Sequence, residues 1–113
     1  MVAVSPGGRT VTDLPKQVRV GGFVWKVDSS PKATLQLAVD GHYGETVLEQ
    51  LTIKVRGDIA PELQRETLLH EMIHAAILQT PLAEWPSDQQ EAICRALPPF
   101  LLEHMLALDA EEQ

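Results

Sequence analysis

The sequence contains few cysteines, few aromatic side chains and little positive charge, and each shortage excludes a class of protein. The single cysteine, Cys94, cannot form an internal disulfide, which is compatible with a reducing compartment. Only 4% of the residues are aromatic, so aliphatic side chains must build the core. The formal net charge of -7 argues against nucleic acid and anionic membranes as partners, because both select basic surfaces.

Long apolar runs are also missing. No window approaches the roughly 18 consecutive apolar residues that a membrane-spanning helix needs, and the N-terminus has no apolar stretch of signal-peptide length. We therefore expect a cytoplasmic protein. The length of 113 residues fits one domain with a single core. We expect a flexible arm over residues 1–16, a domain over 17–109 and an acidic tail over 110–113.

Short apolar runs in the first half of the chain alternate with polar residues, as is typical of strands. Residues 17–28 predict a hairpin, because two consecutive glycines in their middle tolerate the positive φ of a tight turn. Residues 51–55 predict a further strand. The alternation over residues 35–39 also favours a strand. A helix over 32–39 is the alternative, because alanine and leucine are good helix formers.

Two helices are predicted in the second half. Pro61 suits the first turn of a helix over residues 61–79, because its missing N–H has no partner there. Ser87 with Gln90 three residues later forms a capping-box pattern for a second helix, which reaches about residue 107 and is kinked or split by a pair of prolines. This order predicts an α+β fold, with N-terminal antiparallel strands packed on two C-terminal helices.

The first of these helices carries the motif HEMIH at residues 70–74. Four residues along a helix correspond to roughly 400° of rotation and about 6 Å of rise, so His70 and His74 project from one face and can share a metal ion. Glu71 lies beside that face and can act as general base on a coordinated water. The apolar neighbours predict a buried helix, in which these polar side chains are costly unless paired or metallated. The motif therefore predicts a zinc site.

A catalytic zinc site needs a third protein ligand and keeps one position for water. Glu91 is the preferred candidate, because it lies in the first turns of a helix that can run back beside the first; a solvated acid favoured by the helix dipole is the alternative. Asp88 is a candidate acceptor for an imidazole N–H. We expect Cys94 in the core and His104 on a helix surface.

The stretches TLLHEMIHAAI and EAICRALPPFLLEHML resemble the gluzincin-type zincins, especially the small metallopeptidases encoded by phages and prophages. The resemblance covers roughly residues 45–108. It implies a minimal zincin-like fold, a cytoplasmic location in the host cell if the chain is phage-encoded, Glu71 as catalytic base, and zinc ligation by His70, His74 and Glu91.

The resemblance also implies that an extended peptide pairs with the strand at residues 51–55, as the edge of the sheet. The sequence departs from the family elsewhere. Thermolysin-type gluzincins carry an aspartate four residues after the glutamate ligand, where this chain has Arg95. Tyr43, His42 and Arg95 are candidates for stabilising the transition state, and the oxyanion partner is unassigned.

Three functions fit this pattern. The first is a zinc-dependent endopeptidase, active on an extended peptide or protein, with about one zinc ion per chain. The second is a binding module that retains the zincin scaffold without catalysis and docks a protein partner on its edge strand. The third is a closed structural zinc site completed by Cys94 or His104. The sequence does not indicate the oligomeric state.

Overall fold

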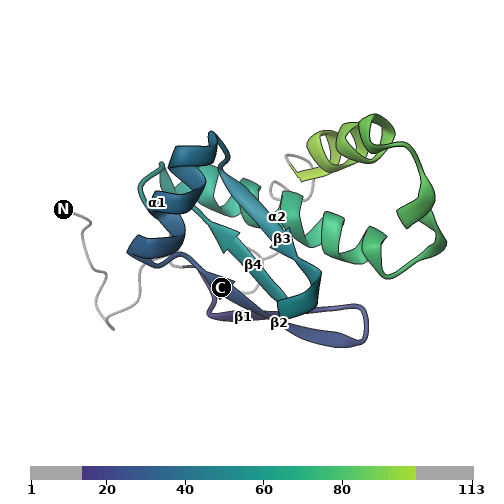
Figure 1. Ribbon diagram of the computed structural model, residues 1–113, viewed down its shortest axis with the longest axis horizontal. Helices are drawn as coiled ribbons and strands as arrows, with labels where there is room; N and C mark the ends of the chain where they lie inside the picture. The colour runs from purple at the N-terminus through teal and green to yellow at the C-terminus, as the bar shows by residue number, and fades with distance from the viewer. Residues whose placement is uncertain (1–13, 99–113) are drawn as a thin grey trace, which may run out of the picture.

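The computed structural model describes residues 14–98, in which a four-stranded mixed sheet is followed by two C-terminal helices (Figure 1). The α+β class predicted from the sequence is confirmed. The predicted N-terminal arm, apart from residues 14–16, lies outside the described residues, as do the predicted helix end near residue 107, His104 and the acidic tail. The elements are β1 (Gln17–Val20), β2 (Phe23–Asp28), α1 (Pro31–Asp40), β3 (Gly44–Val47), the short 3-10 helix η1 (Leu48–Gln50), β4 (Thr52–Val55), α2 (Pro61–Leu78), the 3-10 helix η2 (Pro81–Glu84) and a helical segment over residues 87–98.

Strands β1 and β2 form the predicted hairpin. They are antiparallel, and Val20 pairs with Phe23 across the turn. Gly21 has a φ of 64°, a conformation that favours glycine because it has no Cβ. Leu14 packs against the core, and the Lys16 carbonyl accepts a hydrogen bond from the β2 backbone. The described end of the predicted arm therefore contacts the sheet.

The prediction of a strand over residues 35–39 is wrong, and the alternative of a helix over 32–39 is correct, because these residues belong to helix α1. Ala33 and Leu37, four residues apart, are buried at 2% exposure each, whereas Leu35 and Val39 are 66% and 77% exposed. The alternation in the sequence thus does not reflect which side chains face the interior. Spacing by four, as on one face of a helix, decides burial here.

The signals for α1 lie at its two ends. Ser30 is the N-cap, and its Oγ accepts a hydrogen bond from the Ala33 backbone N–H at 3.2 Å. Pro31 follows at the first helical turn. Gly41 ends the helix in the left-handed conformation, with a φ of 75°. These caps outweigh the strand-like pattern between them.

The strand order in the sheet is β1-β2-β4-β3, which corrects two expectations. Helix α1 connects β2 to the second half of the sheet, so β2 and β4 run parallel and the sheet is mixed rather than wholly antiparallel. Strand β4 pairs with β2 on one side and with β3 on the other. The strand at residues 51–55 is therefore an inner strand, and among the strands within residues 14–98 β3 is the edge strand on that side of the sheet.

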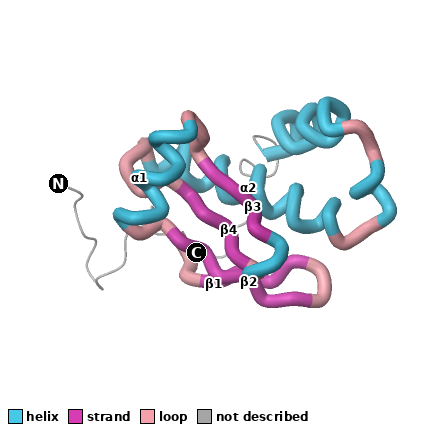
Figure 2. The backbone as a smooth tube through the Cα atoms, in the orientation of Figure 1, coloured by secondary structure: helices cyan, strands magenta, loops and turns pink. Residues whose placement is uncertain are grey.

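Helix α2 packs along the sheet, behind the strands in Figure 1 and in the tube of Figure 2. It begins at Pro61, as predicted, and ends at Leu78. Within residues 14–98, no helix is both long enough and apolar enough to cross a membrane. The core between helix and sheet is formed by Val20, Trp25, Val27, Ile53, Val55, Leu68 and Ala75.

The second C-terminal helix begins one residue earlier than the capping-box pattern indicates. The Pro86 carbonyl accepts from the Gln90 backbone N–H at 3.1 Å, so Ser87 is inside the first turn rather than at the cap. The Gln90 side chain does reach back, but its Nε2 donates to the carbonyls of Ala83 and Trp85. These bonds tie the start of the helix to the preceding 3-10 turn.

Candidate metal centre

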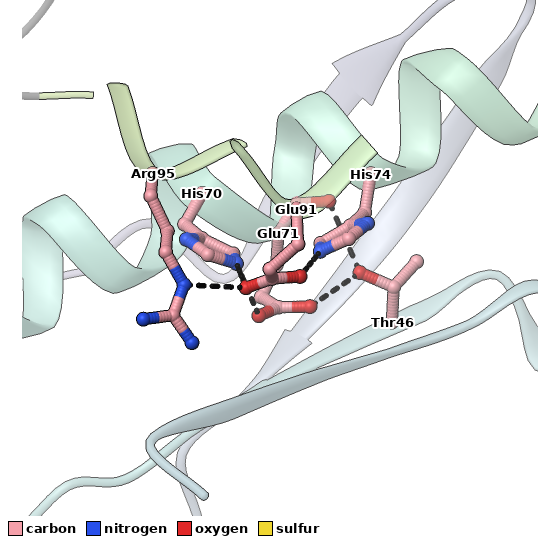
Figure 3. A network of polar contacts seen from close by, with 6 residues as sticks. All are labelled: Thr46, His70, Glu71, His74, Glu91 and Arg95. Atoms are coloured by element: carbon pink, nitrogen blue, oxygen red, sulfur yellow. Dashed lines mark hydrogen bonds and ion pairs between the residues drawn. The ribbon is translucent and has the colours of Figure 1, made fainter. Parts of the chain in front are cut away.

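Three side chains from the two C-terminal helices meet at one point (Figure 3). His70 and His74 project from neighbouring turns of α2, with ring centroids 5.0 Å apart. Glu91, on the helical segment 87–98, lies between them: its Oε1 is 3.1 Å from His70 Nε2 and its Oε2 is 3.0 Å from His74 Nε2. One ligand atom from each residue lies within 4.8 Å of the other two, so the group could hold a metal ion.

The spacing of these atoms fits a small divalent ion. Two ligands in a tetrahedral site with bonds of about 2.0–2.1 Å are about 3.3 Å apart. Each imidazole Nε2 lies near that distance from a different oxygen of Glu91, and all the ligand atoms lie within 4.8 Å of one another. An imidazole nitrogen that binds an ion has no proton to donate to a carboxylate, so coordination would replace the contacts of both imidazoles with Glu91. Two nitrogens and one carboxylate also form a donor set typical of zinc.

Glu71 lies on the opposite side of the site, toward the sheet. Its side chain is buried at 9% exposure, whereas the two histidine side chains are 21% and 24% exposed and line a cleft. The prediction of a buried helix is therefore correct only in part, since of these three residues Glu71 is buried and the two histidines are partly exposed. Its Oε2 is 3.9 Å from His70 Nε2. Its Oε1 is 2.8 Å from Thr46 Oγ1, a hydroxyl on strand β3.

The two glutamates have opposite pKa shifts. Burial raises the pKa of the Glu71 carboxyl, and the hydrogen bond from Thr46 and the nearby imidazoles offset this only in part. Burial also raises the pKa of Glu91, but there a hydrogen bond from Arg95 and the two imidazoles outweigh it, so that this pKa lies below its ordinary value. Glu91 is thus favoured in the charged form that a ligand requires.

The other predicted site residues lie at varying distances from this group. Arg95 Nε donates to Glu91 Oε1 at 3.1 Å. Tyr43 lines the cleft, and the Arg56 guanidinium lies 5.7 Å from the centre of its ring. Asp88 is exposed, and no hydrogen bond among residues 14–98 joins it to an imidazole. Cys94 is buried, as expected, and is not part of the possible metal group found within the described region.

A cleft of about 910 Å³ opens over the group. Strand β3 and the turn before it form one wall, and α2 forms the other. The cleft is lined by Gly41, His42, Tyr43, Gly44, Glu45, Thr46, Leu63, Glu66, Thr67, His70, Glu71, His74, Leu78, Glu91 and Arg95. An edge strand, a carboxylate base candidate and three possible ligands therefore face the same space.

Comparisons of the chain with protein-family models, curated proteins and solved structures found no match. The resemblance to gluzincins thus stays a prediction. The site rests on the geometry of His70, His74 and Glu91 alone.

Proposed function

We propose that the protein is a zinc-dependent peptidase that hydrolyses peptide bonds with an activated water. The observation that carries this proposal is the convergence of His70, His74 and Glu91 within 4.8 Å, with the Glu71 carboxylate 3.9 Å from one of the imidazoles. Three protein ligands would leave one of the four positions around zinc open for water. Catalytic zinc sites keep such a position, whereas structural sites fill it with a fourth protein ligand.

The ligands in this proposal come from two helices held together at the site. His70 and His74 offer Nε2, and Glu91 offers its carboxylate. Zinc bound there would polarise a substrate carbonyl and lower the pKa of a coordinated water to about 7. Glu71 accepts the proton of the attacking water on its carboxylate and returns it to the leaving amine. No covalent intermediate with the protein forms.

The substrate in this proposal is an extended peptide that pairs with strand β3. This strand is the edge of the sheet beside the site, and its residues Gly44, Glu45 and Thr46 line the cleft. A peptide added to such an edge gains backbone hydrogen bonds along its length. It would then cross the cleft next to Glu71. Arg95 and Tyr43 are the candidates for the group that stabilises the oxyanion.

The test combines metal content with hydrolysis. The purified chain is expected to bind about one zinc ion and to cleave members of a mixed peptide library. Glu71→Gln should retain the zinc and lose activity by roughly 10²–10⁴-fold, the usual contribution of a general base. Glu62→Gln is the matched control: Glu62 is an exposed residue in the first turn of the same helix, and activity should not change.

Two results would contradict the proposal. Cleavage that survives Glu71→Gln would exclude the mechanism. A zinc-loaded protein that binds peptides but leaves all of them intact would instead support a binding module on the same scaffold.

A further inference from the structure

Strand β3 holds Glu71 through a contact that the sequence motif does not contain. Thr46 Oγ1 lies 2.8 Å from Glu71 Oε1 and 3.0 Å from the backbone carbonyl oxygen of Glu71 (Figure 3). A hydroxyl has one proton to donate, and bonds to an ionised carboxylate are the stronger ones. The hydroxyl proton therefore points to Oε1 when Glu71 is charged.

The backbone of β3 approaches α2 closely at the same place. A Cβ added to Gly44 would lie 2.7 Å from Thr67 Cγ2 and 3.0 Å from Glu71 Cγ. The glycine thus allows the strand to lie against the helix. Two residues later along the strand, on the same face, Thr46 reaches the carboxylate. The close approach and the hydrogen bond together fix the Glu71 side chain from the sheet side.

This contact distinguishes the two carboxylate oxygens. Oε1 is occupied by Thr46, while Oε2 lies 3.9 Å from His70 Nε2, on the side of the possible metal ligands. We propose that Thr46 is a positioning residue that binds Oε1 of Glu71 and leaves Oε2 as the atom that accepts the proton from water. The inference rests on the proposed peptidase function. Thr46 itself neither gains nor loses a proton in the reaction.

The first test separates the hydroxyl from the shape of the side chain. Thr46→Val removes the hydroxyl and is expected to lower kcat by roughly 10–100-fold, the range typical of groups that orient a site. Zinc content should be unchanged, because no hydrogen bond or ion pair in the structure joins Thr46 to the possible ligands His70, His74 and Glu91. KM should change little, because a peptide on β3 pairs with the strand's backbone rather than with the Thr46 hydroxyl. Thr46→Ser restores the hydroxyl and should recover activity to within about threefold of the original, because most of the loss comes from the hydrogen bond.

The matched control is Thr52→Val. Thr52 is a buried threonine on the neighbouring strand β4, and its hydroxyl donates to the Gln50 carbonyl, away from the cleft. The Thr52→Val substitution should leave kcat unchanged. Equal kcat for Thr46→Val and the unsubstituted chain would overturn the inference, as would a failure of Thr46→Ser to recover more activity than Thr46→Val. In a Glu71→Gln background, Thr46→Val should cause no further loss, because the two residues act as a unit.

A second readout does not depend on activity. In metal-free protein, the ¹³C resonance of the Glu71 carboxyl, assigned with Glu71→Gln, should shift on Thr46→Val and not on Thr52→Val. An unchanged resonance would show that the hydrogen bond is absent in solution and would overturn the inference. If this shift is observed but the unsubstituted chain cleaves no peptide, the peptidase function fails while the contact stands. If the chain cleaves peptides and Thr46→Val does too at full rate, only the positioning role fails.

Discussion

The sheet side and the helix side of the site use the same chemical group in different ways. On the sheet side, the Glu71 side chain is 9% exposed and is held by a hydroxyl from β3. On the helix side, the Glu91 side chain is 37% exposed and contacts two imidazoles and Arg95. Burial decides the pKa direction of the first carboxyl, while charged and hydrogen-bonding neighbours decide that of the second.

The difference in burial between the two glutamates suits two roles, that of a metal ligand and that of a general base. A metal ligand must be charged and able to adjust to an ion, which suits a half-exposed carboxylate on a neighbouring helix. A general base must keep one oxygen in place while it gains and loses a proton, which suits a carboxylate packed against a strand. Substitutions on the helix side should therefore affect metal binding, and those on the sheet side should affect stability and catalysis.

The largest effect is expected on the helix side. His74→Ala removes one of three possible ligands, and zinc affinity should fall more than the roughly 10–100-fold typical of a supporting residue. Isothermal titration calorimetry with zinc measures the affinity of each variant. His42→Ala is the control, because His42 lines the cleft without belonging to the ligand group. Equal affinities for the two variants would show that His74 is not a ligand.

An intermediate effect is expected on the sheet side. Gly44→Ala forces β3 away from α2 and should lower the free energy of unfolding by about 1–3 kcal/mol, as overpacking does. Chemical denaturation measures this. Gly22→Ala serves as the control, since a Cβ there meets nothing within 4 Å. Zinc affinity should change little in either variant, and a large loss of affinity in Gly44→Ala would show that the two sides are not separable.

The smallest effect concerns the ion pair between Arg95 and Glu91. The Arg95 side chain is 75% exposed, and pairs four residues apart on a helix contribute about 0.2–0.5 kcal/mol to stability. Arg95→Gln should therefore lower the free energy of unfolding by no more than this, and the loss should shrink at high salt. A loss above about 1 kcal/mol would mean that Arg95 has a structural role that its exposure does not indicate.

The local part of the fold could be predicted from the sequence, and the long-range part could not. The hairpin follows from two glycines between alternating residues, and α2 follows from Pro61 and an apolar run. The alternation over residues 35–39 favours a strand over the alternative helix at 32–39, but the helix forms, with its N-cap at Ser30 and a proline directly after it. Parallel strands need a crossover connection such as a helix, whereas antiparallel strands can be joined by a short turn. Without α1 in the prediction, the parallel pairing of β2 with β4 cannot be inferred.

The candidate site divides in the same way. His70 and His74 share a face because of helical spacing alone, which the sequence shows directly. Glu91 required only that the next helix run back beside the first, and the structure places it there although the helix begins at a different cap. Thr46 was missed because its contact with Glu71 depends on how β3 pairs with β4 and packs on α2, which no local pattern in the sequence encodes.

The carboxylate of Glu91 bridges the two imidazoles, and this contact determines at which stage the three side chains are brought together. Its Oε2 is hydrogen-bonded to His74 Nε2 and its Oε1 lies 3.1 Å from His70 Nε2, so these contacts join the helical segment 87–98 to α2. The conformational entropy of bringing the three side chains together is therefore lost during folding and not on metal binding. A cation bound by these three residues would use ligand atoms that already lie within 4.8 Å of one another, without rearrangement of the helices.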